Sequence, residues 1–195
     1  MIGLASNPGL VRDVRDQFVP KRWGVVEPGK IYRSGQISGR LIKEMLQEHQ
    51  IARVVDLTLD NPHDRYHEAE LAAISELGIE RTLFPLISDG TGDVKIYAAA
   101  VAAVADAERT GKPVLVHCAA GTQRTGGVIA TYRLLVQKKP PEEVLAEMRH
   151  YKYDPEQSPR LLAYLNDHMG ELAEELVEHG TIDRVPDPLP VLHAE

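Results

Sequence analysis

The sequence predicts an α/β fold in which a central, mostly parallel sheet is flanked by helices. Short apolar runs rich in β-branched residues alternate along the chain with longer segments whose apolar residues have helical spacing. No repeat, low-complexity tract or linker interrupts this alternation. The run Val114–Val116 leads through a loop of small residues into a helical segment, and a parallel sheet places its functional sites at such junctions.

The length and composition favour one domain over residues 1–195. A chain of 195 residues is long enough to bury roughly 70% of its unfolded surface in one core. Residues 1–20 have no clear period and are expected to form an N-terminal arm packed on the domain. Residues 180–195 include three prolines and are expected to form an extended C-terminal tail.

Charge and cysteine content limit the classes of partner. The formal net charge of −7 and a pI near 5.6 argue against nucleic acid and anionic membranes, which both select basic surfaces. A single Cys excludes a disulfide within the chain and favours a reducing compartment. No basic segment followed by an apolar one begins the sequence, so we expect a soluble, cytoplasmic protein. The oligomeric state stays open.

The first half of the chain is expected to contain a β-hairpin, two helices and two further strands. Pro and Gly between the first two β-type runs predict the hairpin turn, and Gly78 follows the end of the second helix. The predicted hairpin strands are 23–26 and 30–33, and the two further strands are 51–59 and 80–85. The first helix is predicted over 38–50. The second helix is predicted to begin at a turn over residues 60–62 and to run to Leu77.

The second half is expected to contain a mobile loop, a central strand and four helices. Two glycines and two aspartates predict the loop at residues 86–93, and prolines mark the ends of the later segments. The predicted helices are 94–110, 125–138, 141–151 and 159–179.

Two histidines on the second predicted helix have the spacing of metal ligands. His63 and His67 lie one turn apart, with several carboxylates nearby. No third ligand is evident, and a solvated polar face accounts for the same residues. We therefore predict no metal site.

The segment His117–Gly127 carries the pattern H-C-x-x-G-x-x-R-[ST]-G. A strand, a tight loop and a helix N-terminus point several backbone N–H groups at one place, and the positive end of the helix dipole adds to them. Together they predict a phosphate site formed by Ala119, Ala120, Gly121, Thr122, Gln123 and Arg124.

The side chains of this segment predict nucleophilic chemistry. Cys118, at the mouth of the loop, is expected to have a pKa well below ~8.5 and to act as a thiolate. Arg124 can bind two phosphoryl oxygens at once, and the Thr125 hydroxyl can donate to the sulfur. His117 is expected to orient the loop and support the thiolate. The alternative, a small buried hydrophobic Cys, does not explain the joint pattern.

This segment resembles the signature loop of the cysteine-dependent protein tyrosine phosphatase superfamily, especially its small dual-specificity-like members from plants, fungi and bacteria. The resemblance implies the protein tyrosine phosphatase-like fold, a phosphocysteine intermediate and no cofactor. The stretch Tyr32–Ser38, YRSGQIS, resembles a recurrent stretch of those small phosphatases. Arg33 and Gln36 are therefore expected to support the catalytic loop; the alternative is an ordinary surface strand end with an ion-paired Arg.

The leaving oxygen needs a proton donor, and the loop at residues 86–93 offers two. Asp89 lies 29 residues before Cys118 and Asp93 lies 25 before it. The resembling families carry this acid about thirty residues upstream, after a proline-containing strand end, which favours Asp89. Asp93 is better explained as the N-cap of the following helix.

The substrate is expected to be a phosphorylated protein or a small phosphomonoester. The variable loop positions carry no charge, whereas relatives that act on lipid or inositol polyphosphates have basic residues there. This favours phosphotyrosine, with phosphoserine and phosphothreonine as further substrates. The alternatives are a phosphoinositide or inositol phosphate phosphatase, a rhodanese-like sulfur carrier and a non-catalytic phosphate-binding module.

Overall fold

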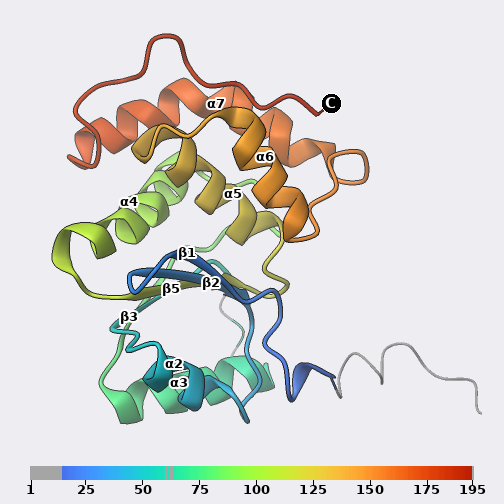
Figure 1. Ribbon diagram of the computed structural model, residues 1–195, viewed down its shortest axis with the longest axis vertical. Coiled ribbons are helices and arrows are strands. Elements are labelled where there is room, and N and C mark those ends of the chain that lie inside the picture. The colour runs from blue at the N-terminus through green and yellow to red at the C-terminus, as the bar shows by residue number, and fades with distance from the viewer. Residues whose placement is uncertain (1–14, 60, 62–63, 195) are drawn as a thin grey trace, which may run out of the picture.

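Five strands form one sheet in the computed structural model, which describes residues 15–59, 61 and 64–194 (Figure 1). Their order across the sheet is β1-β2-β5-β3-β4. The first two strands are antiparallel, and every other neighbouring pair is parallel. The predicted α/β class is therefore confirmed. The strands are β1 (Gly24–Glu27), β2 (Ile31–Gly35), β3 (Arg53–Asp56), β4 (Glu80–Leu83) and β5 (Val114–Cys118).

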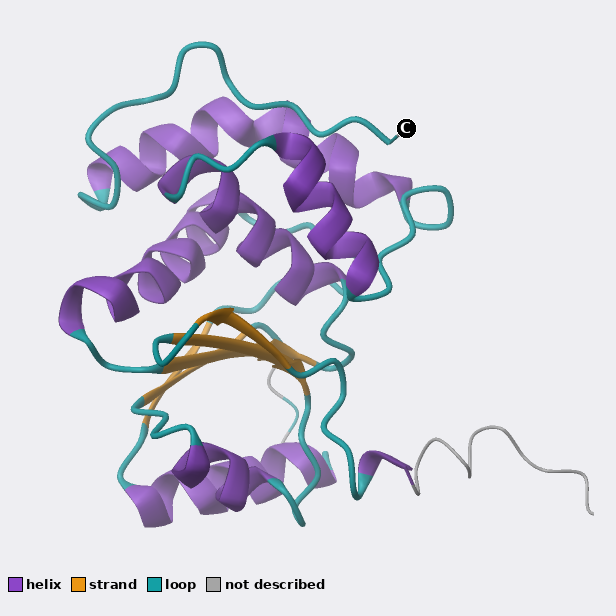
Figure 2. Ribbon diagram, viewed as in Figure 1, coloured by secondary structure: helices purple, strands orange, loops and turns teal. Residues whose placement is uncertain are grey.

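Helices cover both faces of the sheet (Figures 1 and 2). One face is covered by two helices, α2 (Ile42–Glu48) and α3 (Arg65–Leu77). The other face is covered by a larger group, which includes the final helix on the outside. This group consists of α4 (Val94–Thr110), α5 (Gln123–Thr131), α6 (Pro141–His150) and α7 (Pro159–Glu178).

The central strand β5 contributes to a separate hydrophobic core on each face. Val114, Val116 and Cys118 belong to the core under α4 to α7, whereas Leu115 belongs to the core with α2 and α3. Successive side chains of a strand point to opposite faces of the sheet. Because both faces of β5 are buried, its sequence is almost wholly apolar. This alternation places the side chains of His117 and Cys118 on opposite sides of the sheet.

Local capping explains which helix boundaries were predicted well. The bounds of α4 agree with the prediction, because the Asp93 side chain accepts hydrogen bonds from the Lys95 and Ile96 N–H groups. The start of α3 was predicted too early: Asp64 caps this helix and accepts from the Tyr66 N–H group. Ser38 does not cap α2, which begins only at Ile42.

The sequence predicts one continuous helix over residues 125–138, but the helix in the structure is not uniform. It changes after Thr131 into a π-helical segment, η1 (Tyr132–Val136). In this wider turn Arg133 is 6% exposed and bonds to Glu27 of β1 at 2.6 Å and to Glu147 of α6 at 2.8 Å. The segment therefore ties the site-bearing helix to both neighbours.

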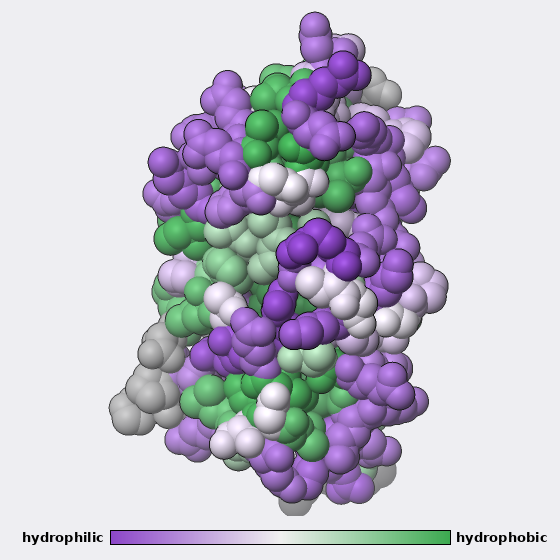
Figure 3. Space-filling view, turned by 90° about the vertical axis from the view of Figure 1, so that its left-hand side faces the viewer, coloured by the Kyte–Doolittle hydropathy of each residue, from purple (hydrophilic) through white to green (hydrophobic). Residues whose placement is uncertain are grey.

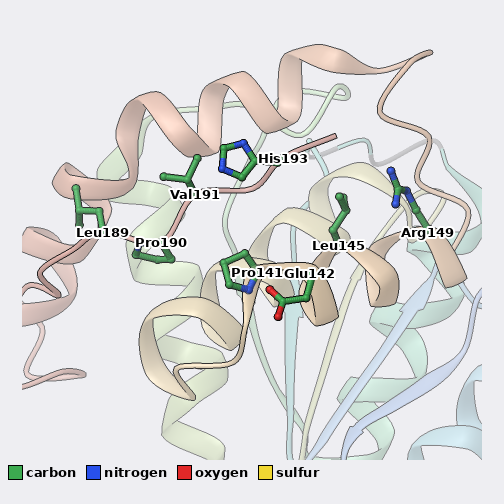
Figure 4. Close-up of a pocket in the computed structure, with 8 residues that line it drawn as sticks. All are labelled: Pro141, Glu142, Leu145, Arg149, Leu189, Pro190, Val191 and His193. Carbon is green, nitrogen blue, oxygen red and sulfur yellow. The ribbon is translucent and has the colours of Figure 1, made fainter. Parts of the chain in front are cut away.

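Beyond α7, the described tail at residues 180–194 contains no helix or strand and runs back over the outer helices (Figure 1). Leu192 is buried, and its backbone pairs with the Asn166 side chain through two hydrogen bonds of 2.9 Å. A groove of about 500 Å³ separates the tail from α6 (Figure 4). Its lining consists of Pro141, Glu142, Leu145, Arg149, Leu189, Pro190, Val191 and His193.

The surface in Figure 3 carries hydrophilic side chains over most of its rim and hydrophobic ones in smaller patches between them. Within the described part of the chain, no helix combines the length and apolar character needed to cross a bilayer. Residues 1–14 of the predicted N-terminal arm lie outside the described residues.

Candidate active site

Three parallel strands end together beside the predicted phosphate loop. Gly35 at the end of β2 pairs with Cys118, and Asp56 at the end of β3 pairs with His117. The loop at residues 119–122 therefore leaves the sheet between the carboxyl ends of β2 and β3. Such an edge is where parallel α/β sheets bind ligands.

The thiol of Cys118 lies at the floor of this loop. The residue is 2% exposed, so it is deeper than the mouth position expected from the sequence. Gly121 N–H donates to Sγ at 3.2 Å. Burial raises the pKa of the thiol, but the Thr125 hydroxyl, the Arg124 charge and backbone N–H groups outweigh burial and hold the pKa below its ordinary value.

The start of α5 has the donors that an anion requires. Thr122 occupies the N-cap position, but its side chain makes no capping hydrogen bond. Arg124 donates from Nη1 to the Leu57 carbonyl at 3.3 Å, while its buried Nε has no hydrogen-bond partner among the described residues. Ala119 and Ala120 are exposed around this point, and Gln123 begins the helix. The predicted phosphate-binding residues are contiguous along the loop and the first turn of α5.

Strand β2 supports the loop from one side. Arg33 is fully buried and donates from Nη2 to the Gly121 carbonyl at 2.7 Å, with its guanidinium 3.8 Å from the Tyr151 ring centroid. The interpretation as a surface strand end is therefore wrong. Gln36 acts through its backbone, whose N–H donates to Ala119 at 3.2 Å. Gly35 permits the close approach, because a Cβ there would lie 2.8 Å from the Ala120 carbonyl.

A residue before β1 supports the loop from outside. Arg22 donates from Nη1 to the Ala120 carbonyl at 2.7 Å, and its Nε is buried with no partner among the described residues. The neighbouring Lys21 carbonyl accepts from Gly35 N–H at 2.7 Å. Sequence reasoning missed this contact, because the segment has neither a period nor a motif to mark it.

The loop with the predicted general acid packs beside the start of α5. A Cβ at Gly90 would lie 3.1 Å from the Gln123 backbone. The Asp89 carboxylate accepts from the Thr91 hydroxyl at 2.8 Å and pairs with Arg160 at 3.0 Å. Partial burial raises the pKa of Asp89, but these bonds and the Arg160 charge outweigh burial and lower the pKa. Asp93 serves as the N-cap of α4.

A groove of about 370 Å³ lies beside this loop. It separates the loop from α7 and is bounded by both apolar and ionisable side chains. The lining residues are Ile87, Thr91, Gly92, Arg160, Ala163, Tyr164, Asp167 and His168.

The side chain of His117 belongs to a buried cluster on the α3 side of the sheet. His67 and Glu70 are each 5% exposed, so the solvated face predicted for this helix is wrong. His63 lies outside the described residues. The ligand atoms of Asp56, Glu70 and His117 lie within 4.8 Å of one another. A cation already pairs with both carboxylates, because Arg81 lies 2.5 Å from Asp56 and 3.4 Å from Glu70. The cluster is therefore explained as an ion-pair network.

Comparison with known proteins gives matches for most of the chain. A family model for the catalytic domain of dual specificity phosphatases matches residues 33–169. The dual specificity protein phosphatase TpbA of Pseudomonas aeruginosa is 29% identical over 130 residues, which is 67% of this chain. The match spans 55% of that relative, so the chain corresponds to about half of its length.

Solved structures share the fold. The crystal structure of P. aeruginosa TpbA has a TM-score of 0.64 at 23% identity and covers 82% of this chain and 91% of its own. The core catalytic domain of the PP-IP phosphatase SIW14 from S. cerevisiae also has a TM-score of 0.64, at 19% identity, and covers 88% of this chain and 97% of its own.

Proposed function

This chain belongs to the dual specificity phosphatase catalytic domain family, and from this premise we propose that it hydrolyses phosphate monoesters through a phosphocysteine intermediate. The observation that carries the proposal is the convergence of the Cys118 thiol, the Gly121 N–H group and Arg124 on the uncapped start of α5. A thiolate nucleophile and donors for three equatorial oxygens are what phosphoryl transfer requires.

In the first step, Sγ of Cys118 attacks phosphorus and the bond to the leaving oxygen breaks. Arg124 and the loop N–H groups bind the equatorial oxygens, whose charge they match. The Thr125 hydroxyl stabilises the sulfur both before attack and when it later leaves. We assign the proton for the leaving oxygen to Asp89, which must first leave its contacts with Thr91 and Arg160.

In the second step, water attacks the phosphocysteine and gives its proton to Asp89. The phosphorus–sulfur bond breaks, inorganic phosphate leaves and Cys118 returns to the thiolate. This step regenerates the proton on Asp89 that the next cycle needs. The residues named here supply every proton transfer, and the mechanism uses no metal or cofactor.

The substrate that we favour is phosphotyrosine in proteins, followed by phosphoserine and phosphothreonine. The loop side chains of Ala119, Ala120, Thr122 and Gln123 carry no charge that would bind a second phosphate. The groove beside Asp89 offers apolar surface for residues that flank the phosphorylated one. Among similar structures, TpbA has been solved in complex with pTyr.

An inositol phosphate remains a second candidate because cations border the loop from outside it. Arg22 contacts the loop directly, and Arg160 lies 78% exposed beside Asp89. The similar SIW14 domain is described as a PP-IP phosphatase. Additional phosphates would need such additional cations.

Phosphate release from a substrate panel tests the proposal. The panel contains phosphotyrosine, phosphoserine and phosphothreonine peptides, a phosphoinositide and an inositol polyphosphate at equal concentrations. We expect the highest kcat/KM for the phosphotyrosine peptide. A preference for inositol polyphosphate that is lost in Arg22→Gln would support the second candidate, and no turnover of any substrate would refute both.

A further inference from the structure

Four ionisable side chains meet in the interior beneath the catalytic loop. Nε2 of His117 lies 2.9 Å from Oε2 of Glu70 and 3.9 Å from Oδ1 of Asp56. Arg81 joins the two carboxylates from the far side. Asp56 and His117 are 1% and 2% exposed, so solvent screens these charges little. The four residues come from four different elements: β3, α3, β4 and β5.

The orientation of His117 separates it from substrate. Its side chain lies on the α3 side of the sheet, whereas the next residue, Cys118, belongs to the core on the other side. His117 therefore cannot touch a phosphoryl group bound by the loop. Its charge can still act on the neighbouring thiolate, because the two residues are adjacent and both are buried.

The net charge of the cluster indicates the protonation state of His117. The two carboxylates contribute two negative charges and Arg81 contributes one positive charge. With a neutral imidazole the cluster would bury one unpaired negative charge, whereas an imidazolium balances it. Arg81 also lies 3.3 Å from Nδ1 of His67.

We propose that Glu70, together with Asp56 and Arg81, is a positioning group that keeps His117 protonated at neutral pH and thereby maintains Cys118 as a thiolate. The proposal rests on the proposed function of Cys118. Supporting it, burial lowers the pKa of His117, but the charges of Glu70 and Asp56 outweigh burial and raise the pKa to about 9. The groups that face His117 are those of the network, with Cys118 beyond the strand.

The proposal predicts whether removal of the Glu70 charge stabilises or destabilises the Cys118 thiolate. Glu70→Gln keeps the shape of the side chain but removes the charge nearest to His117. At pH 7.5 we expect His117 to become neutral, because burial then dominates its titration. The thiolate loses a positive neighbour. If Glu70 acted only as a negative charge near the sulfur, its removal would instead stabilise the thiolate.

Two measurements that do not depend on phosphatase activity test this inference. Carbon-13 NMR of the His117 ring follows its protonation between pH 5.5 and 8. Alkylation by iodoacetamide reports thiolate, and the single Cys of the chain makes the signal specific to Cys118. Glu68→Gln is the matched control, because Glu68 is exposed on the same helix.

We expect His117 of the wild type to stay protonated up to pH 8. In Glu70→Gln we expect it to titrate below pH 7.5, and alkylation at pH 7.5 to fall about fivefold. Glu68→Gln should match the wild type. A wild-type His117 midpoint near 6.5, or unchanged or faster alkylation of folded Glu70→Gln, would overturn the proposal. If Glu70→Gln does not fold, the wild-type titration decides alone.

Discussion

Replacing Gly121 by Ala should damage the site far more than the size of one methyl group suggests. Gly121 has a φ of +79°, where a side chain costs about 1–2 kcal/mol. The added Cβ would also lie 2.5 Å from the Gly35 N atom and 2.7 Å from the Ser34 carbonyl carbon. Both atoms are backbone of β2, so the loop must move by roughly half an ångström or more to restore contact distances.

Such a displacement would move the donors around Cys118. Misplacement by about 1 Å costs roughly 100-fold in rate, so we expect kcat/KM of Gly121→Ala to fall about 100-fold. We expect its melting temperature to fall by about 2–8 °C. Hydrolysis of para-nitrophenyl phosphate and thermal melts followed by circular dichroism measure the two quantities.

Gly126→Ala is the matched control for this variant. Gly126 lies in α5, five residues after Gly121, and a Cβ there would meet nothing within 4 Å. Ala is also the better helix former by roughly 0.5–1 kcal/mol. We expect kcat/KM within about twofold of the wild type and an equal or higher melting temperature. If Gly121→Ala kept more than half of the wild-type kcat/KM with an unchanged melt, the geometric reasoning would be refuted.

Four variants and a peroxide treatment test individual assignments. Asp89→Asn should lower kcat by about 100-fold for phosphotyrosine and less for para-nitrophenyl phosphate. Asp93→Asn should leave both kcat and stability nearly unchanged, because Asn caps a helix about as well as Asp; the reverse pattern in kcat would exchange the two roles. Arg160→Gln should raise the pKa of Asp89, because it removes a positive charge, and should move the basic limb of the kcat/KM profile to higher pH; an unmoved limb would contradict the ion pair. Arg124→Lys should lower kcat at least 10-fold, since an ammonium lacks the two-pronged geometry, and a change in KM alone would make it a binding residue. Brief peroxide should inactivate the enzyme reversibly and bound phosphate should protect it; an unmodified Cys118 in inactivated protein, measured by mass spectrometry, would exclude a reactive thiolate.

Local signals explain what the sequence predicted well. The cap and turn residues of α4 are neighbours in the chain, so its bounds could be predicted without any tertiary information. The predicted phosphate loop is likewise contiguous, and the contacts of Cys118 with Gly121, Arg124 and Thr125 all lie within it. The stretch around Arg33 was identified by resemblance, and the structure gives the physical reason: its guanidinium supports Gly121 and Gly35 makes room for the loop.

Long-range pairing explains what the sequence did not predict. Glu70 and His67 have the spacing of a polar helix face, and only the positions of Arg81 and His117 on distant strands reveal that this face is buried. The π-helical segment also depends on partners far away in the chain, which lie on β1 and α6. No local pattern marks Arg22 or Arg160 as neighbours of the site.

Hydrolysis of para-nitrophenyl phosphate by the wild type and by Cys118→Ser tests whether Cys118 forms a covalent bond to phosphorus. A serine hydroxyl has nearly the size of the thiol but is far less ionised. We expect steady turnover by the wild type, and turnover below a few per cent by a Cys118→Ser variant that folds and still binds phosphate. Turnover by Cys118→Ser above that level would contradict the covalent mechanism.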